Sequence, residues 1–301
     1  MTDLATPRFP SVPEGKGHYE SFYLTATAPQ GGRAVWVRNT ILKRPGAPPR
    51  PTLWVTLFEA GAPPARARVT LDEAPEAAGW LRCGTAAHAG PERFRGAIDG
   101  ASWELRLEAG EPELQYLPAQ RLYDTRLPST KAVALHPRAR VSGTATAGDR
   151  SFELDGWDAM AGHNWGAEHA EHWIWLHAAL PGGWVDLVLG RTRLGPVLAP
   201  WLGGGALSVD GRRTRLGGPR GRARVTVAGE RVELEVPAGR ERLLVRTQLP
   251  ETSTVRWDYA SPSGAARDVR NCSVADADMQ LTGRRWEVAA ATAIEAGVPA
   301  A

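Results

Sequence analysis

The chain has 301 residues, a formal net charge of +3 and 12 tryptophans. This length is sufficient for two domains, each with its own core. Its positive charge comes mainly from arginines dispersed among Asp and Glu, which argues against a nucleic-acid partner. Residues 1–17 are polar and contain several prolines, and no stretch approaches ~18 apolar residues, so we expect a cytoplasmic protein without a transmembrane segment. The oligomeric state stays open.

Apolar and polar residues alternate along most of the chain, with the period of two that is typical of half-buried strands. Residues 19–28 and 33–43 are two such runs, and Gln30-Gly31-Gly32 between them predicts a hairpin because glycine tolerates a positive φ. Helical spacing of apolar residues is almost absent. Further strands are predicted at residues 52–59, 66–71, 94–98, 102–107, 113–117, 254–259, 270–275 and 286–293. The sequence therefore predicts an all-β protein.

A meander is predicted in the second half of the chain. Turns at Ala228-Gly229 and Ala238-Gly239 separate runs in which valine and leucine alternate with polar residues. These strands and the earlier ones are too many for a single eight-stranded barrel. We therefore expect two lipocalin-like antiparallel barrels in tandem, one formed by residues 1–127 and the other by residues 128–301, because closure removes exposed sheet edges.

Several familiar kinds of site are absent from the sequence. Cys83 and Cys272 are far apart and lack the spacing of metal ligands, so neither a disulfide framework nor a zinc ribbon is supported. There is no nucleophile elbow of the Gly-x-Ser-x-Gly type, no P-loop and no dinucleotide-binding glycine motif. The triple glycine at residues 203–205 is typical of a flexible turn.

Residues 155–177 differ from the rest of the chain because they concentrate histidine and tryptophan. If residues 171–177 form a strand, alternation places Trp173, Trp175 and His177 on one face. A face that combines indoles with titratable groups suits a pocket for a large apolar molecule with one reactive polar point. The alternative is that the tryptophans fill the barrels. The candidate ligand contacts are Trp36, Arg38, Trp165, His169, Trp173, Trp175, His177 and Tyr259.

The histidines of this segment allow three interpretations. Together with Glu168 they are numerous enough to bind a metal, but their spacing fits no helical pair, and a strand would separate His172 from His177, so we expect no zinc or iron. They could instead hydrogen-bond to loop backbone where the chain passes between the barrels. Alternatively, one of them could orient or protonate a ligand.

Gly162-His163-Asn164-Trp165-Gly166 resembles the His-Asn-Trp-Gly element of the superfamily that contains hydroxyneurosporene synthase (carotenoid 1,2-hydratase), AttH-like proteins, tocopherol cyclase-like proteins and fungal Diels–Alderases. Trp36-Val37-Arg38 in an early strand adds to the resemblance. Diels–Alderase-like sequences carry His-Asp before the motif, where this chain has Ala161-Gly162. The resemblance implies two lipocalin-like β-domains and chemistry on polyenes, prenylated quinols or polyketide-derived dienes without a redox cofactor.

The combined observations predict a cofactor-independent enzyme of the hydratase, cyclase or isomerase type that acts on a hydrophobic isoprenoid or polyketide. Proton addition to an olefin needs an acid beside aromatic faces that stabilise developing positive charge. His163 or Glu168 could supply the proton, with Asn164 as a third candidate catalytic residue. The alternative is a carrier or sensor that binds the same hydrophobic molecule without chemistry.

Overall fold

The structure, a computed structural model, describes residues 3–125, 127–218 and 222–298. It confirms the all-β prediction. Within those ranges the helical elements are three short 3₁₀ helices, η1 (Phe9–Ser11), η2 (Gln120–Asp124) and η3 (Glu251–Ser253). None of the helices in the described part of the chain has the length and apolar character needed to cross a membrane.

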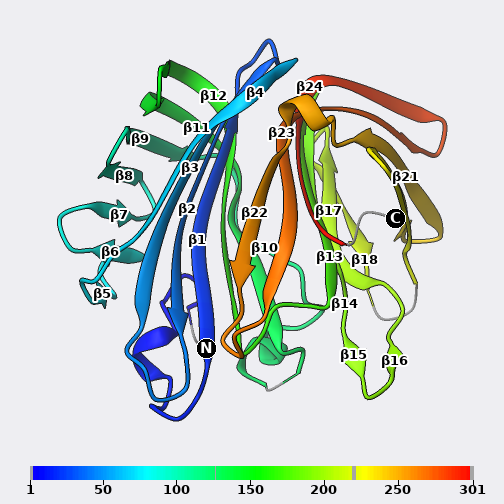
Figure 1. Ribbon diagram of the computed structural model, residues 1–301. Coiled ribbons are helices and arrows are strands. Elements are labelled where there is room, and N and C mark those ends of the chain that lie inside the picture. Colours follow the sequence, from blue (N-terminus) through cyan, green and yellow to red (C-terminus); the bar gives the residue numbers. More distant parts are fainter. Residues whose placement is uncertain (1–2, 126, 219–221, 299–301) are drawn as a thin grey trace.

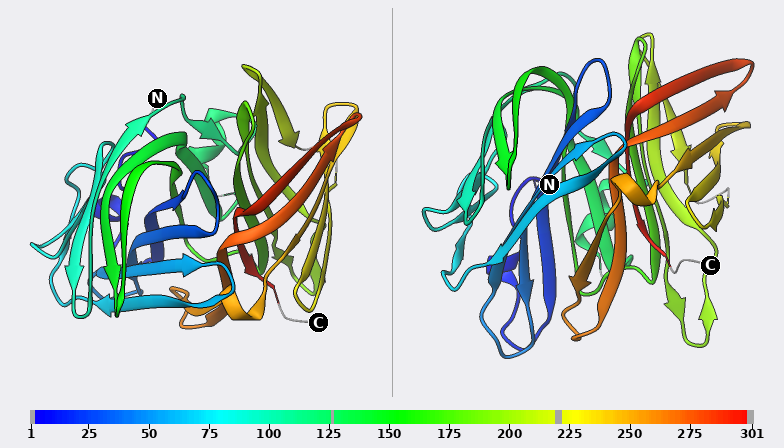
Figure 2. Two further views of the ribbon diagram at one scale, coloured as in Figure 1. Left: turned by 90° about the horizontal axis from the view of Figure 1, so that it is seen from above. Right: turned by 45° about the horizontal axis from the view of Figure 1, so that its top comes forward.

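The strands form two large, strongly curved antiparallel sheets that stand side by side (Figures 1 and 2). The first sheet has the order β4-β3-β2-β1-β12-β11-β9-β8-β7-β6-β5, and β10 also pairs with β11. Its strands are β1 (His18–Thr27), β2 (Arg33–Lys43), β3 (Arg50–Glu59), β4 (Ala62–Thr70), β5 (Pro75–Glu76), β6 (Leu81–Cys83), β7 (Ala87–Ala89), β8 (Arg93–Ile98), β9 (Ala101–Ala109), β10 (Leu114–Gln115), β11 (Thr130–Ala147) and β12 (Arg150–Gly166).

The second sheet has the order β18-β17-β14-β13-β24-β23-β21-β20-β19, and β22 also pairs with β23. Its strands are β13 (His172–Leu180), β14 (Gly183–Arg191), β17 (Leu202–Val209), β18 (Arg212–Gly217), β19 (Arg224–Ala228), β20 (Arg231–Ala238), β21 (Glu241–Gln248), β22 (Val255–Ala260), β23 (Ala266–Leu281) and β24 (Arg284–Gly297). A separate small hairpin pairs β15 (Arg193–Leu194) with β16 (Val197–Leu198).

One apolar core belongs to the first sheet, a second is formed by the second sheet together with Ala34, Trp36, Trp54 and Phe58 of β2 and β3, and a third, smaller cluster also lies between the sheets. Alternation decides which side chain goes where. On β1, Phe22 belongs to the core of the first sheet, whereas Tyr23 points to the opposite face. Tyr23 packs between the sheets together with Met160 of β12 and Trp175 of β13. The two cores are therefore joined by a buried layer, and polar groups in that layer are shielded from water.

The predicted strands agree well with the observed ones, and two expectations differ in detail. The hairpin at Gly31-Gly32 is present, with φ of 72° and 77°. The triple glycine is not a flexible turn but part of β17, where it permits close approach of neighbouring backbone: a Cβ on Gly204 would overlap the carbonyl oxygen of Tyr116. The expected boundary at residues 127 and 128 falls between β10 and β11, within the first sheet. The chain passes from the first sheet to the second at residues 167–171.

Candidate functional site

A largely apolar pocket of about 380 Å³ lies between the two sheets. Its wall takes residues from β1, β2, β11 and β12 of the first sheet and from β13, β14, β17, β22 and β24 of the second. The volume is within the usual range for small-molecule sites. The titratable or amide side chains of the wall are Tyr19, Arg38, Tyr116, Lys131, Asn164, His169, Tyr259 and Glu295. We call this space the inner pocket.

Glu295 is the sole carboxylate among the described residues that line the inner pocket. Its side chain is 12% exposed and accepts hydrogen bonds from the Tyr259 hydroxyl at 2.7 Å and the Trp173 indole nitrogen at 2.9 Å. The Arg38 guanidinium lies 4.0 Å from the carboxylate and 4.1 Å from the centroid of the Tyr259 ring. The strand order brings Glu295 of β24 close to Trp173 of β13 and Tyr259 of β22, because β24 lies between β13 and β23, and β22 pairs with β23. The result is a charged pair held among aromatic faces.

Burial shapes the protonation of this cluster. Burial raises the pKa of Tyr259 well above its usual value, while the charge of Arg38 works in the opposite direction, so the phenol is protonated at neutral pH. Burial, with Arg38 and Arg267 adding to it, lowers the pKa of His169 to about 3. His169 is therefore a neutral imidazole at physiological pH. Its ring lies 3.9 Å from the ring of Tyr19, centroid to centroid.

A second buried carboxylate lies next to the inner pocket. Asp186 of β14 is 0% exposed; it accepts a hydrogen bond from the Tyr116 hydroxyl and lies 3.0 Å from Nδ1 of His177. Tyr116 also lines the inner pocket. Burial, followed by the charge of Asp186, raises the pKa of Tyr116 well above its usual value. A hydrogen-bonded chain thus runs from the pocket wall through Asp186 to His177.

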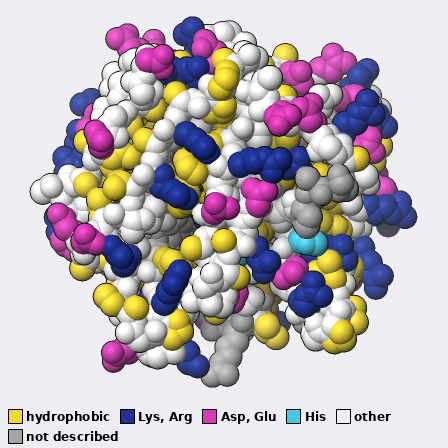
Figure 3. Space-filling model, in the orientation of Figure 1, with side chains coloured by type: hydrophobic (Ala, Val, Ile, Leu, Met, Phe, Trp, Pro, Cys, Tyr) yellow, Lys and Arg dark blue, Asp and Glu magenta, His cyan; other side chains and the backbone are white. Residues whose placement is uncertain are grey.

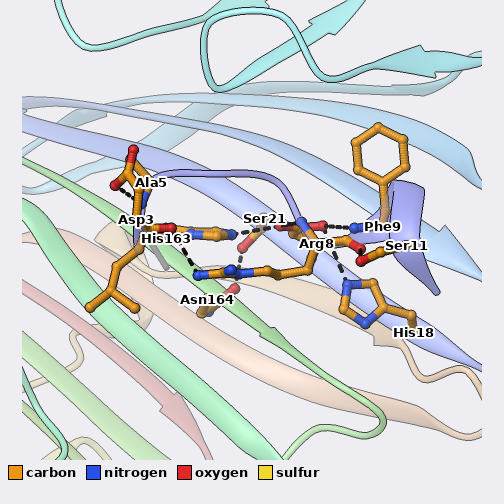
Figure 4. Close-up of polar contacts among 11 residues, drawn as sticks. Asp3, Ala5, Arg8, Phe9, Ser11, His18, Ser21, His163 and Asn164 are labelled. Carbon is orange, nitrogen blue, oxygen red and sulfur yellow. Dashed lines mark hydrogen bonds and ion pairs between the residues drawn. The ribbon is translucent and has the colours of Figure 1, made fainter. Parts of the chain in front are cut away.

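His163 lies in a different place, under the N-terminal segment (Figure 4). Its ring is stacked between Phe22, at 4.1 Å, and Trp165, at 4.4 Å between centroids. Nδ1 is 2.7 Å from the carbonyl oxygen of Leu4, and Nε2 is 2.7 Å from the carboxylate of Glu20. Because a carbonyl oxygen only accepts, Nδ1 must donate. The imidazole is fully committed to structural partners.

Glu20 is the carboxylate on which the hydrogen bonds of this region converge. Its oxygens accept the backbone N–H groups of Arg8 at 2.7 Å and Phe9 at 2.8 Å, besides the contact with His163 and one with His18 at 3.3 Å. Burial alone would raise the pKa of Glu20, but the hydrogen bonds from the two histidines outweigh it and lower the pKa to about 2. Glu20 and His163 therefore form a buried clasp that fastens residues 4–9 onto the first sheet. We refer to this arrangement as the N-terminal clasp.

The inner pocket brings together five of the candidate site residues: Arg38, Asn164, His169, Trp173 and Tyr259. The other six lie elsewhere in the described structure. His163 and Trp165 belong to the N-terminal clasp, Trp36 packs in the core of the second sheet, and Trp175 packs against Tyr23 between the sheets. His177 pairs with Asp186, and Glu168 accepts hydrogen bonds from the backbone N–H and hydroxyl of Ser263.

Two acidic residues of this region were not predicted as site residues, although the sequence around them has a recognisable pattern. Glu295 and Asp186 each interrupt a run that is otherwise apolar, Ala293-Ile294-Glu295-Ala296 and Val185-Asp186-Leu187-Val188. A lone carboxylate in such a run must be buried with a partner, because an unpaired buried charge is costly. No group of three or more His, Cys, Asp or Glu side chains suited to a metal occurs in residues 3–125, 127–218 and 222–298. The absence of zinc and iron stays a prediction.

Comparison with known proteins gives relatives for the whole chain. No protein-family profile matches the sequence. The uncharacterized proteins Rv0493c and MT0513 of two Mycobacterium tuberculosis strains are each 28% identical over 306 residues, covering 94% of this chain and 91% of theirs.

Two solved structures resemble the whole chain. A protein provisionally assigned as AttH (NE1406) from Nitrosomonas europaea has a TM-score of 0.59 at 14% identity, covering 98% of both chains. Kievitone hydratase from Nectria haematococca has a TM-score of 0.56 at 9% identity, covering 100% of this chain and 93% of the hydratase. At these identities the likeness concerns the fold. The chain therefore has the two-sheet fold of these AttH-like and hydratase structures.

Proposed function

We propose that the protein is a hydratase-type enzyme that uses its own side chains, without a cofactor, to act on a hydrophobic isoprenoid or polyketide-derived substrate. The observation that carries the proposal is the position of Glu295, a carboxylate hydrogen-bonded to Tyr259 at 2.7 Å in the wall of an apolar pocket. Hydration needs one group that gives a proton to carbon and one that takes a proton from water. Tyr259 is our candidate for the first group and Glu295 for the second. The fold shared with kievitone hydratase supports the same reading.

The proposed reaction is the addition of water across a carbon–carbon double bond. Tyr259 gives its hydroxyl proton to one carbon, and water forms a C–O bond with the other carbon. Glu295 takes a proton from that water and returns one to the Tyr259 phenolate, so the enzyme ends as it began. Arg38, 4.1 Å from the Tyr259 ring centroid, stabilises the phenolate while it exists. The faces of Tyr19 and Trp173 stabilise positive charge on the substrate.

The test is turnover of a prenylated phenol and of a linear polyene alcohol, followed by mass spectrometry in H₂¹⁸O. We expect Glu295→Gln to lower kcat by roughly 10²–10⁴-fold, the range typical of a lost acid–base group. Glu287→Gln is the matched control, because Glu287 lies on the same strand but is exposed and outside the inner pocket.

Two results would count against the proposal. Equal turnover in the Glu295→Gln and Glu287→Gln variants would remove Glu295 from the chemistry. Saturable binding of both probes, seen as quenching of tryptophan fluorescence, with no ¹⁸O-labelled product in the wild-type protein would instead favour the carrier or sensor alternative.

A further inference from the structure

A second hollow, of about 640 Å³, lies on the outer face of β2, β3 and β4, beside β22. We call it the outer groove. Tyr19, Arg38, His169 and Tyr259 line both the outer groove and the inner pocket. These four side chains therefore form the partition between the two spaces. A ligand that occupies both spaces must therefore pass between these side chains.

The register of the first sheet builds the floor of the outer groove. Arg38, Trp54 and Arg68 are directly opposite one another on β2, β3 and β4, so their side chains lie on one face in a row. The Arg68 guanidinium lies 4.9 Å from the centroid of the Trp54 ring. The next row on the same face consists of Thr40, Thr52 and Thr70.

Positive charge dominates this groove. Its lining includes Arg38, Arg44, Arg50 and Arg68 against the acids Glu20 and Asp258. Glu20 is already committed to the N-terminal clasp. Figure 3 shows basic side chains gathered near the middle of this face, over the region of β3, β4 and β22 in Figure 1.

Two of the arginines have unused capacity to bind an anion. Arg38 is 4% exposed, yet its Nε finds no hydrogen-bond partner among the described residues. A buried donor without a partner is costly unless a ligand completes it. Arg68 makes no ion pair within the described ranges, and its guanidinium is held in place by the faces of Trp54 and Trp257. Stacking leaves the edge of a guanidinium free to donate to an oxyanion.

We propose that the outer groove is an anion subsite, and that the ligand of this protein is an amphiphile whose carboxylate or phosphate group lies against Arg38 and Arg68 while its apolar part crosses the partition into the inner pocket. This inference rests on the proposed function only for the placement of the apolar part. It does not depend on the hydration chemistry.

The test compares four probes by isothermal titration calorimetry on the full chain: decyl phosphate, decanoate, decanol and inorganic phosphate. We expect the two acids to bind at least about tenfold more tightly than decanol, since a charge-assisted hydrogen bond is worth at least one such factor. Raising NaCl from about 0.05 M to about 0.5 M should weaken the acids more than decanol, because salt screens exposed charges.

Arg68→Gln should remove most of the preference for the acids. Arg66→Gln is the matched control, because Arg66 lies two residues away on the same face of β4, stacks 4.7 Å from the Trp257 ring centroid and lies outside the outer groove. Both variants lose one positive charge from an exposed position; Arg66→Gln also loses the hydrogen bond that Arg66 donates to the carbonyl oxygen of Arg256, so any loss of stability should be larger in the control.

Each outcome decides the matter. Equal affinity for decanol and the acids, or equal losses in the Arg68→Gln and Arg66→Gln variants, would overturn the anion subsite while leaving the hydratase proposal untouched. Inorganic phosphate binding as tightly as decyl phosphate would overturn the amphiphile. A preference for the acids that persists in Glu295→Gln, even where no hydration is found, would uphold the subsite by itself.

Discussion

The N-terminal clasp makes a quantitative prediction for Glu20→Gln. The pKa of Glu20 falls from an ordinary 4.5 to about 2, which at 1.36 kcal/mol per unit corresponds to about 3 kcal/mol of folding free energy at neutral pH. The amide adds a second penalty. Each carboxylate oxygen of Glu20 accepts one backbone N–H group, that of Arg8 or that of Phe9, and a backbone N–H group can only donate, so the new NH₂ group must face one of them.

The pH dependence identifies the source of this loss. Because the pKa of Glu20 is lower in the folded chain than in the unfolded one, its stabilisation is present above about pH 4.5 and is lost as the pH falls towards about 2. The difference in unfolding free energy between wild type and Glu20→Gln should therefore be at least about 3 kcal/mol at pH 7, and the part of it that comes from the pKa shift, about 3 kcal/mol, should be lost on acidification through that window. Comparing the two proteins cancels the contribution of every other carboxylate.

The assay is urea unfolding followed by tryptophan fluorescence, combined with hydrogen exchange of residues 4–9. We expect faster exchange in that segment of the variant, since the carboxylate binds the backbone N–H groups of Arg8 and Phe9. Glu14→Gln serves as the control, because Glu14 is an exposed carboxylate of the same region. A Glu20→Gln protein as stable as Glu14→Gln at pH 7, or a difference that does not change with pH, would refute the reasoning.

Three further predictions concern the layer between the sheets. Tyr116→Phe should cost about 1–3 kcal/mol in urea unfolding, because it leaves a buried carboxylate oxygen without its donor; an unchanged midpoint would contradict this. Gly204→Ala should destabilise the protein by roughly 1–3 kcal/mol through overlap with backbone, whereas Gly190→Ala, whose new methyl group meets open packing at 3.8 Å, should be nearly neutral. Trp173→Phe should reduce ligand-induced fluorescence quenching more than Trp80→Phe, because Trp173 lines the inner pocket; equal reductions would favour tryptophans that merely fill cores.

The sequence pattern was sufficient for the strands but not for the arrangement of the sheets. In β20, for example, the predicted alternation of Val232, Leu234 and Val236 appears as buried positions between exposed or partly exposed ones. Alternation is a local property, so it can be read from neighbouring residues. The pairing of β1 with β12 joins residues some 140 positions apart, as in Phe22 with His163. No local signal specifies such a pairing, and the extent of the first sheet was therefore not predictable.

The candidate site, too, could be predicted from the sequence only in part. Alternation correctly placed Trp173, Trp175 and His177 on the face opposite Ile174 and Leu176, which pack in the core of the second sheet. Alternation could not show which of the three side chains lines the inner pocket, because that depends on the side chains of the first sheet that face them. His163 drew attention by its motif, yet its partners Leu4 and Glu20 come from segments far away in the sequence.

The strand order also has a consequence for synthesis of the protein on the ribosome. β13 is the first strand of the second sheet in the chain, and it pairs with β14 on one side and with β24 on the other. Its second partner, β24 (Arg284–Gly297), is the last strand to be synthesised. The same late strand delivers Glu295. During translation the first sheet can assemble while the second still lacks its central strand, β24. Until β24 is made, the second sheet is incomplete and the inner pocket lacks Glu295. In a nascent chain, the backbone N–H and C=O groups along one edge of β13 therefore stay unpaired until residue 297 has been synthesised.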